Sequence, residues 1–194
     1  MMRALAASFV VALAVAACGG GPESGKSDAT PDPNSFVAAA TANRAQAGLA
    51  NAQGSAVGSA TIVEDRVGVH ITLNVANLPP GKHGVHVHAA GKCEPPAFTT
   101  AGGHFNPDGK QHGALNPQGP HAGDLGNIDV DERGNGTLRV TSSRLSLGPG
   151  ASNSLLVGGG LSIVVHAGPD DEKTDPAGNS GDRIACGLIK RIGS

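Results

Sequence analysis

Hydrophobic and polar residues alternate with a period of two along much of this chain. The clearest case is the run 67–75. Its alternating apolar positions are Val69, Ile71, Leu73 and Val75, and the positions between them are His70, Thr72 and Asn74. Successive side chains of a strand point to opposite faces, so this pattern predicts a strand with one face in a core. His70 then belongs to the solvent face, and we assign it no metal-binding role.

The same pattern predicts further short strands. They cover residues 56–63, the segment ending in Val85-His86-Val87-His88, and residues 127–130, 137–140, 161–166 and 184–189. Residues 131–136 are typical of a hairpin turn, whereas 89–125 contain no strand-like run, and a loop of that length usually has a function. Short strands with long connections predict an all-β fold, a Greek-key β-sandwich or flattened β-barrel.

The composition favours the same class of fold. Thirty glycines and thirteen prolines indicate turns and irregular loops rather than helices. With four Phe and no Tyr or Trp, the core must consist of Val, Ile, Leu and Ala. The formal net charge is −2 and no basic run is interleaved with aromatic residues, so nothing supports nucleic-acid binding.

The N-terminus has the features of an export signal. A basic start is followed by an apolar stretch, residues 4–17, that is too short to span a bilayer. It leads into Val15-Ala16-Ala17-Cys18-Gly19, which resembles a bacterial lipoprotein signal that is cleaved before a lipidated cysteine. The alternative is an ordinary secretory peptide with an incidental cysteine. In both cases the mature chain leaves the cytoplasm.

We therefore expect three segments: a signal peptide (1–17), a lipidated flexible tether rich in Gly, Ser, Pro and Asp (18–45), and a folded domain (46–194). The structure of residues 36–50 is left open, because this Ala-rich stretch has no clear apolar stripe. The expected location is the cell envelope, anchored by lipid at a periplasmic or extracellular membrane face. With Cys18 lipidated, Cys93 and Cys186 form an even pair in an oxidising compartment, which predicts a disulfide rather than free thiols or copper ligands.

Seven residues have the types and spacing of a two-metal site. They are His86, His88, His104, His112, His121, Asp124 and His166. His86 and His88 are two apart in a β-branched run, so one strand directs both imidazoles to one face. The next four follow in a stretch rich in Gly and Pro, and the last ends an apolar run. Neutral imidazole suits copper and zinc, and three histidines with a carboxylate form a closed zinc set.

From about residue 46 to 191 the chain resembles the copper/zinc superoxide dismutase family. Five segments carry the resemblance, in the family's order: Gly81-Lys82-His83-Gly84-Val85-His86-Val87-His88, Gly102-Gly103-His104-Phe105-Asn106-Pro107, Lys110-Gln111-His112-Gly113, His121-Ala122-Gly123-Asp124-Leu125-Gly126-Asn127 and Gly181-Asp182-Arg183-Ile184-Ala185-Cys186-Gly187. The family is itself a standard example of the sandwich architecture, with long metal-binding and electrostatic loops.

The resemblance implies a role for each candidate residue. Copper would be held by His86, His88, His104 and His166, and zinc by His104, His112, His121 and Asp124. His104 would bridge the metals as an imidazolate. Asp170 would accept hydrogen bonds from His86 and His112, with Asp171 as the competing candidate. Arg183 would attract superoxide beside the copper, and His83 would be structural.

The implied reaction is a ping-pong dismutation of superoxide to oxygen and hydrogen peroxide, in which copper changes oxidation state and His104 takes up and returns a proton. Family members are established examples of enzymes near the diffusion limit that are aided by electrostatic steering. The segment between His166 and Arg183 departs from the family pattern, because it is short and its charged residues are mostly acidic. Its charged residues are Asp170, Asp171, Glu172, Lys173, Asp175 and Asp182.

Three other functions compete with this one. A protein that buffers or delivers copper without turnover would usually lack the arginine or the bridging histidine. A zinc-only structural module leaves His86, His88 and His166 unexplained. A metallohydrolase needs an open zinc position and a general base, which a closed set does not offer. The resemblance is compatible with a monomer and with a homodimer.

Overall fold

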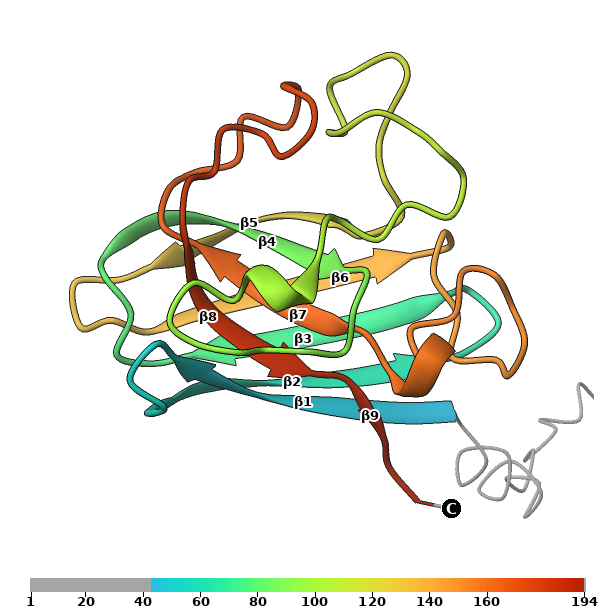
Figure 1. The fold of residues 1–194 in the computed structure, drawn as a ribbon, viewed down its shortest axis with the longest axis horizontal. Helices are drawn as coiled ribbons and strands as arrows, with labels where there is room; N and C mark the ends of the chain where they lie inside the picture. Colours follow the sequence, from blue (N-terminus) through green and yellow to red (C-terminus); the bar gives the residue numbers. More distant parts are fainter. Residues whose placement is uncertain (1–42, 194) are drawn as a thin grey trace, which may run out of the picture.

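The computed structural model describes residues 43–193, in which nine strands, all paired antiparallel, supply nearly all the regular structure (Figure 1). They are β1 (Asn43–Asn51), β2 (Ala56–Glu64), β3 (Val69–Val75), β4 (Gly81–His88), β5 (Asp124–Val130), β6 (Gly136–Ser142), β7 (Ser162–His166), β8 (Arg183–Leu188) and β9 (Lys190–Arg191). Two short 3-10 helices, η1 (Thr99–Ala101) and η2 (Val157–Gly159), lie in connections. No helix in the described range is long and apolar enough to cross a membrane.

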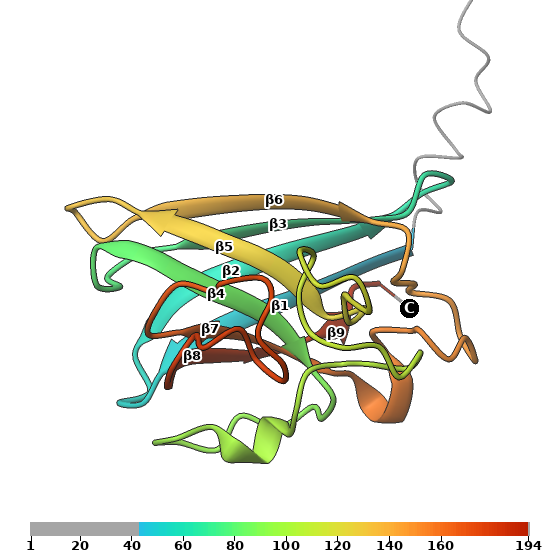
Figure 2. The same ribbon diagram turned by 90° about the horizontal axis from the view of Figure 1, so that it is seen from above.

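The strands close into a barrel. Neighbours follow the order β2-β3-β6-β5-β4-β7-β8-β1, and β1 pairs back with β2, while β9 pairs with β1 beyond the end of β8. The non-consecutive pairs β3–β6 and β4–β7 are the crossovers of a Greek key. Only one residue pair, Val130 with Gly136, joins β5 to β6, so the barrel is nearly split there (Figure 2). The predicted fold class, a Greek-key sandwich or flattened barrel, is confirmed.

The core consists of small aliphatic side chains, as the composition requires. In β3 the residues Val69, Ile71, Leu73 and Val75 are all buried. The central strand β4 differs, because every residue from His83 to His88 is buried. Val85 and Val87 belong to the hydrophobic core. The alternating histidines lie on the other face, where loops rather than a second sheet cover them.

β1 was not predicted, and it shows why the Ala-rich stretch was ambiguous. Ala45, Ala47 and Leu49 are buried at alternate positions and pack into the core. Alanine is the best helix former, so two of its three inward residues carry no β signal. The strand begins at Asn43, three residues before the expected start of the domain at 46. The predicted signal peptide, Cys18 and residues 19–42 lie outside the described residues.

Two long connections, residues 89–123 and 167–182, rise on the same side of the barrel (Figure 1). β5 begins earlier than the predicted 127, so Asp124 lies at the start of a strand and not in the loop. It pairs with His86 of β4, across a register shift that follows Gly84. The connection 89–123 contains three of the seven expected metal ligands, His104, His112 and His121, and 167–182 contains Asp170.

Candidate metal centre

Four histidines from three parts of the chain meet beside β4. His86 and His88 lie on β4, and His166 ends β7, which pairs with β4. His104 lies in the 89–123 connection, where a β-bridge to His88 holds it against the end of β4. One ring nitrogen from each of the four lies within 4.8 Å of the other three.

Hydrogen bonds on the outer ring atoms orient two of these imidazoles. His88 Nδ1 donates to the carbonyl oxygen of Gly102 at 2.9 Å, and His166 Nδ1 donates to that of Gly181 at 3.0 Å. Each ring then presents the lone pair of Nε2 to the cluster, and the two Nε2 atoms are 3.4 Å apart. Two acceptors this close repel each other unless a cation lies between them.

The other two histidines leave nitrogen atoms without a partner. His86 Nε2 is 2.7 Å from Asp170 Oδ2, so its Nδ1 faces the cluster. His86 Nδ1 and His104 Nε2 are buried and have no hydrogen-bond partner among the described residues. Buried polar atoms are rarely left unpaired in proteins. A cation that takes four imidazoles would satisfy all of these atoms, and copper is such a cation.

A second cluster surrounds the carboxylate of Asp124. Its Oδ1 lies 3.0 Å from His104 Nδ1, 3.1 Å from His112 Nδ1 and 3.3 Å from His121 Nδ1. Ligands about 2.0–2.1 Å from a tetrahedral zinc ion lie roughly 3.3 Å from one another, so these separations suit zinc. Asp124 Oδ2 accepts the backbone N–H groups of Gly113 and His121, each at 2.9 Å, which fixes the carboxylate.

By mutual distance alone, the four-residue group around Asp124 whose ligand atoms all lie within 4.8 Å of one another contains His86 and not the predicted His121. Its other members are His104 and His112. Hydrogen bonding separates the two candidates. His86 is already committed through Nε2 to Asp170 and through Nδ1 to the first cluster. His121 Nδ1 is buried without a hydrogen bond and faces Asp124 Oδ1. The donor chemistry therefore favours His121 as the fourth member of the second cluster.

His104 contributes to both clusters. Its Nδ1 lies against Asp124 in the second cluster, while its Nε2 is the unpartnered atom in the first. The ring stacks on His86, with centroids 3.9 Å apart, and meets the ring of His121 edge-on. One imidazole thus separates two metal-sized positions and offers a nitrogen to each.

Asp170 contacts one histidine of each cluster. Its Oδ2 is 2.7 Å from His86 Nε2, and its Oδ1 is 2.9 Å from His112 Nε2. Asp171, the competing candidate, makes no such contact, because its carboxylate accepts hydrogen bonds from Thr174 and Asn179 within its own loop. The structure therefore places Asp170, and not Asp171, between one histidine of each cluster.

Comparisons with known proteins agree with this geometry. Residues 56–189 match the family model described as copper/zinc superoxide dismutase. The chain belongs to the copper/zinc superoxide dismutase family. It is 50% identical over 148 residues to superoxide dismutase [Cu-Zn] 2 of Aquifex aeolicus, covering 76% of this chain and 86% of that protein. It is 43% identical over 139 residues to superoxide dismutase [Cu-Zn] of Caulobacter vibrioides, covering 71% of this chain and 80% of the relative.

A solved structure supports the same assignment. The crystal structure of a SOD-like protein from Bacillus subtilis superimposes with a TM-score of 0.71 at 39% identity, covering 74% of this chain and 96% of that chain. As a member of this family the chain is a dismutase that converts superoxide to oxygen and hydrogen peroxide, and its metals are copper and zinc. The resemblance inferred from the five motifs is confirmed.

Arg183, the residue expected to attract superoxide, borders the opening of this dismutase site. Its Nη1 donates to the carbonyl oxygen of Phe98 at 2.6 Å, and its Nη2 donates to that of Gly102 at 2.7 Å. The predicted disulfide between Cys93 and Cys186 is present, three residues beyond Arg183. It joins β8 to the 89–123 connection, so the segment that carries Arg183 is linked covalently to the loop that carries His104.

Burial keeps the imidazoles of the first cluster neutral, as metal binding requires. Desolvation lowers the pKa of His86 to about 3, that of His88 to about 2 and that of His166 to about 4. His112 behaves differently. Desolvation opposes its protonation, but hydrogen bonds to Asp124 and Asp170 outweigh that effect and raise its pKa to about 10. Hydrogen bonds also outweigh desolvation at the two carboxyls. Those from His104 and His112 hold the pKa of Asp124 well below the usual range, and those from His112 and His86 do the same for Asp170.

The two remaining histidines have other roles. His83 is buried and has a carbonyl oxygen beside each ring nitrogen, that of His166 at 2.8 Å from Nδ1 and that of Pro79 at 2.8 Å from Nε2. It links β4 to the end of β7 and faces neither cluster. His70 is on the outer face of β3, where it contacts Asp65 and Thr141. Neither contributes to the clusters, as expected.

Sequence reasoning missed two residues that hold Asp170. Asn127 Oδ1 accepts the backbone N–H of Asp170 at 2.8 Å, and Asn127 Nδ2 donates to the backbone oxygen of Asp170 at 2.9 Å. Gly178 has a φ of +62°, and a Cβ there would collide with the Asp170 carboxylate and with His112 Nε2. Asn127 ends one of the five motifs, so a signal existed, whereas Gly178 is one of many glycines in the loops.

Proposed function

We propose that copper binds at the first cluster and zinc at the second. The copper ligands would be His86 Nδ1 and the Nε2 atoms of His88, His104 and His166, and the zinc ligands the Nδ1 atoms of His104, His112 and His121 with Asp124 Oδ1. The observation that carries the proposal is the placement of His104, which offers one ring nitrogen to each cluster. A second cation beside the first is what lets a neutral imidazole lose its remaining proton.

When bound, copper supplies the one-electron oxidation and reduction of superoxide, while zinc supplies charge and fixes geometry without redox chemistry. The chain supplies the remaining requirements. Asp170 fixes the ring orientation of His86 and His112 through hydrogen bonds. His104 Nε2 is the basic atom at the bottom of the opening, and it would hold and return one of the two protons needed for hydrogen peroxide, with the second coming from solvent. Arg183 provides a fixed cation for the substrate anion.

A copper-storage or copper-delivery protein is the strongest competing function. Such a protein needs ligands, but it has no need for an imidazole shared between two sites. It also has no need for an arginine held at the opening by two backbone carbonyl groups. Both features are present, so turnover is the function that the geometry supports best.

Activity of purified, metal-loaded protein tests this proposal. We expect the wild type to dismutate superoxide and His88→Gln to lose copper and activity together. His70→Gln is the matched control, because His70 lies on the outer face of β3. It should keep both metals and full activity. A fully metallated wild type without activity would refute the enzymatic function, and metal analysis would show whether storage remains as an explanation.

We also propose that the protein acts outside the cytoplasm, anchored by lipid at Cys18 after removal of residues 1–17. The disulfide supports an oxidising compartment, and the motif ending at Cys18-Gly19 supports lipidation. Cys18→Ser should move the protein from the membrane fraction to the soluble envelope fraction, with dismutase activity per copper unchanged. Retention of the variant in membranes would show that another segment anchors the chain.

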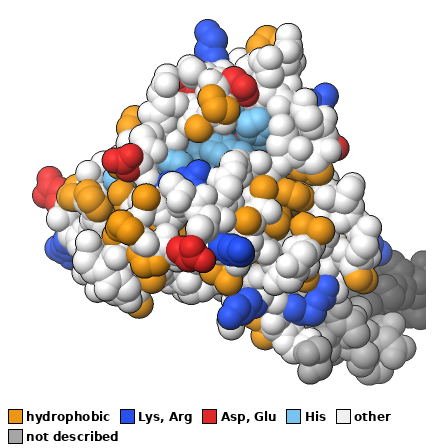
Figure 3. Space-filling model, in the orientation of Figure 1, with side chains coloured by type: hydrophobic (Ala, Val, Ile, Leu, Met, Phe, Trp, Pro, Cys, Tyr) orange, Lys and Arg blue, Asp and Glu red, His pale blue; other side chains and the backbone are white. Residues whose placement is uncertain are grey.

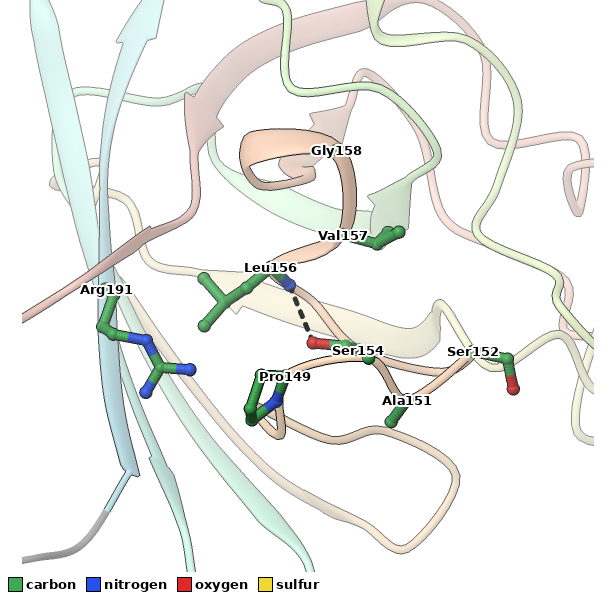
Figure 4. Close-up of a pocket in the computed structure, with 9 residues that line it drawn as sticks. Pro149, Ala151, Ser152, Ser154, Leu156, Val157, Gly158 and Arg191 are labelled. Carbon is green, nitrogen blue, oxygen red and sulfur yellow. Dashed lines mark hydrogen bonds between the residues drawn. The ribbon is translucent and has the colours of Figure 1, made fainter.

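A homodimer is the assembly we propose, on the basis of one apolar surface. A cavity of about 540 Å³ lies between Pro149, Leu156 and Arg191 (Figure 4). Val157 lines it with 47% of its surface exposed, and Ile192 adjoins Arg191 with 41% exposed. Val157→Asp should shift a sedimentation profile from dimer to monomer. Val67→Asp, at a more exposed valine in the turn before β3, should not.

A further inference from the structure

A hollow of about 420 Å³ leads from solvent to histidines of both clusters, and few charged groups line it. Figure 3 shows imidazoles at the bottom of a hollow on this face. The histidines that line the hollow are His88, His104, His121 and His166. Its charged lining residues are Lys110, Asp175 and Arg183. These three side chains set the charge that an approaching anion meets.

The loop 167–182 contributes a negative charge to this opening and no positive one. Asp170 faces inward to the histidines, and Asp171 is occupied by hydrogen bonds within its own turn. Lys173, the loop's one cation, is exposed but does not line the hollow. Glu172 and Asp182 border separate depressions, beside Asn127 and beside Pro96 respectively. Asp175 is therefore the loop's only charged residue at the opening.

Two contacts hold Asp175 at the opening. Its Oδ1 accepts the backbone N–H of His112 at 2.7 Å and lies 3.8 Å from His121 Nε2. It thereby joins the short loop 167–182 to the connection that carries the second cluster. The carboxylate is nevertheless about half exposed, so its charge also faces an incoming anion. The residue that joins the two loops therefore also places a negative charge at the opening, and this charge repels superoxide.

Lys110 lies in the 89–123 connection and carries a positive charge, opposite to that of Asp175. Its backbone is held at the rim by Asn106, which accepts the Lys110 N–H at 2.9 Å and donates to the Lys110 carbonyl oxygen at 2.7 Å. Asn106 itself lines the hollow. The Lys110 ammonium makes no ion pair within residues 43–193, whereas Lys82 pairs with Asp129. The neighbouring acid Asp108 is exposed but does not line the hollow.

We propose that Lys110 is a substrate-steering residue, whose charge offsets Asp175 and leaves the opening with one net positive charge from Arg183. This inference rests on the proposed function and names a residue that affects the rate of superoxide dismutation. A cleft with low-dielectric walls and a net positive charge raises the local concentration of an anion and its rate of encounter. In this chain the attracting charge comes from the 89–123 connection and not from the loop 167–182.

Rate measurements at varied ionic strength test the proposal. Copper- and zinc-loaded Lys110→Gln should react with superoxide about two- to threefold more slowly than wild type at low salt, and Lys110→Glu more slowly still. The decline of the wild-type rate with added salt should flatten in Lys110→Gln, because salt screens exposed charges. Metal content should be unchanged in both variants, since Lys110 contacts no predicted ligand. A Lys110→Gln protein with the wild-type rate and salt dependence would overturn the proposal.

Lys173→Gln is the matched control, because it removes the same charge from an exposed site outside the hollow. A loss equal to that of Lys110→Gln would show that net charge matters and position does not, which also overturns the proposal. Asp175→Asn should raise the rate at low salt, the opposite of Lys110→Gln. An inert wild type would refute the proposed function, whereas an active wild type with an insensitive Lys110 refutes the steering role alone.

Discussion

Arg183 and His88 donate to the same acceptor, the carbonyl oxygen of Gly102. The distances are 2.7 Å from Arg183 Nη2 and 2.9 Å from His88 Nδ1. The bond from His88 sets the tautomer that leaves Nε2 free for a metal, and the bond from Arg183 holds the guanidinium beside the opening. One backbone group thus positions both the cation that meets the substrate and a ligand of the proposed copper site.

This arrangement predicts that Arg183→Ala separates catalysis from metal binding. Gly102 would keep its bond from His88, so copper content should be unchanged. The rate with superoxide should fall about tenfold or more, because a fixed cation beside the reacting anion is lost. Arg133→Ala, in the exposed β5–β6 turn, is the control and should react at nearly the wild-type rate. Loss of copper from Arg183→Ala would instead assign the residue a structural role.

Asp170→Asn should weaken zinc binding about 10- to 100-fold, because the carboxylate that orients His112 and His86 is lost. Competition with a chromophoric chelator measures the zinc affinity directly. Asp171→Asn changes an exposed carboxylate one residue away, whose hydrogen bonds lie within its own turn. That variant should bind zinc like the wild type. Equal losses in the two variants would indicate that general disruption of the loop is the cause.

The sequence was sufficient to predict most strands, because period-two alternation survives wherever one face meets a core. Residues 69–75 show this directly. β1 was missed because Ala45 and Ala47 fill the tight interior of the barrel, and their small side chains carry no strand preference. Asp124 was placed in a loop because its strand pairing with His86 depends on β4, which lies far away in sequence.

The seven candidate ligands could be named from sequence because ligand chemistry requires particular residue types, and short motifs preserve their spacing. The residues that support these ligands could not be named from sequence. Gly178 matters only because the loop 167–182 folds back on Asp170 and His112, and Asp175 only because it reaches the backbone of His112. These contacts join segments about 60 residues apart, as the His112–Asp175 separation of 63 shows. No local pattern encodes them.

Gly178→Ala tests whether this packing matters for zinc. The substitution places a methyl group against the Asp170 carboxylate and His112 Nε2 at a φ of +62°. Gly109→Ala is a close match, since Gly109 has the same φ of +62° with no atom within 4 Å of an added Cβ. Both variants should lose about 1–2 kcal/mol from the strained backbone. Only Gly178→Ala should also release zinc to a chelator, and comparable zinc loss from Gly109→Ala would contradict the steric explanation.

Metal binding should release protons from two particular imidazoles. In the metal-free protein the pKa of His112 is raised to about 10, so its proton is bound at pH 7 and is lost only as the pH rises through about 10. A ligand nitrogen must be deprotonated, so zinc must displace this proton. The neutral histidines of the first cluster, such as His88 with a pKa of about 2, have no such proton to lose. His104 should lose one more proton when both of its nitrogens bind metal.

Zinc binding at pH 7 should therefore release about one proton, and subsequent copper binding about one more. The apparent zinc affinity should rise about tenfold per pH unit between pH 6 and 9, because zinc and a proton compete for His112. Calorimetric titrations in buffers of different ionisation enthalpy count the protons at each step. In Asp170→Asn the His112 proton loses one of its two acceptors, so the zinc affinity should depend less steeply on pH. A wild-type zinc affinity that does not change with pH would show that His112 is neutral before the metal arrives.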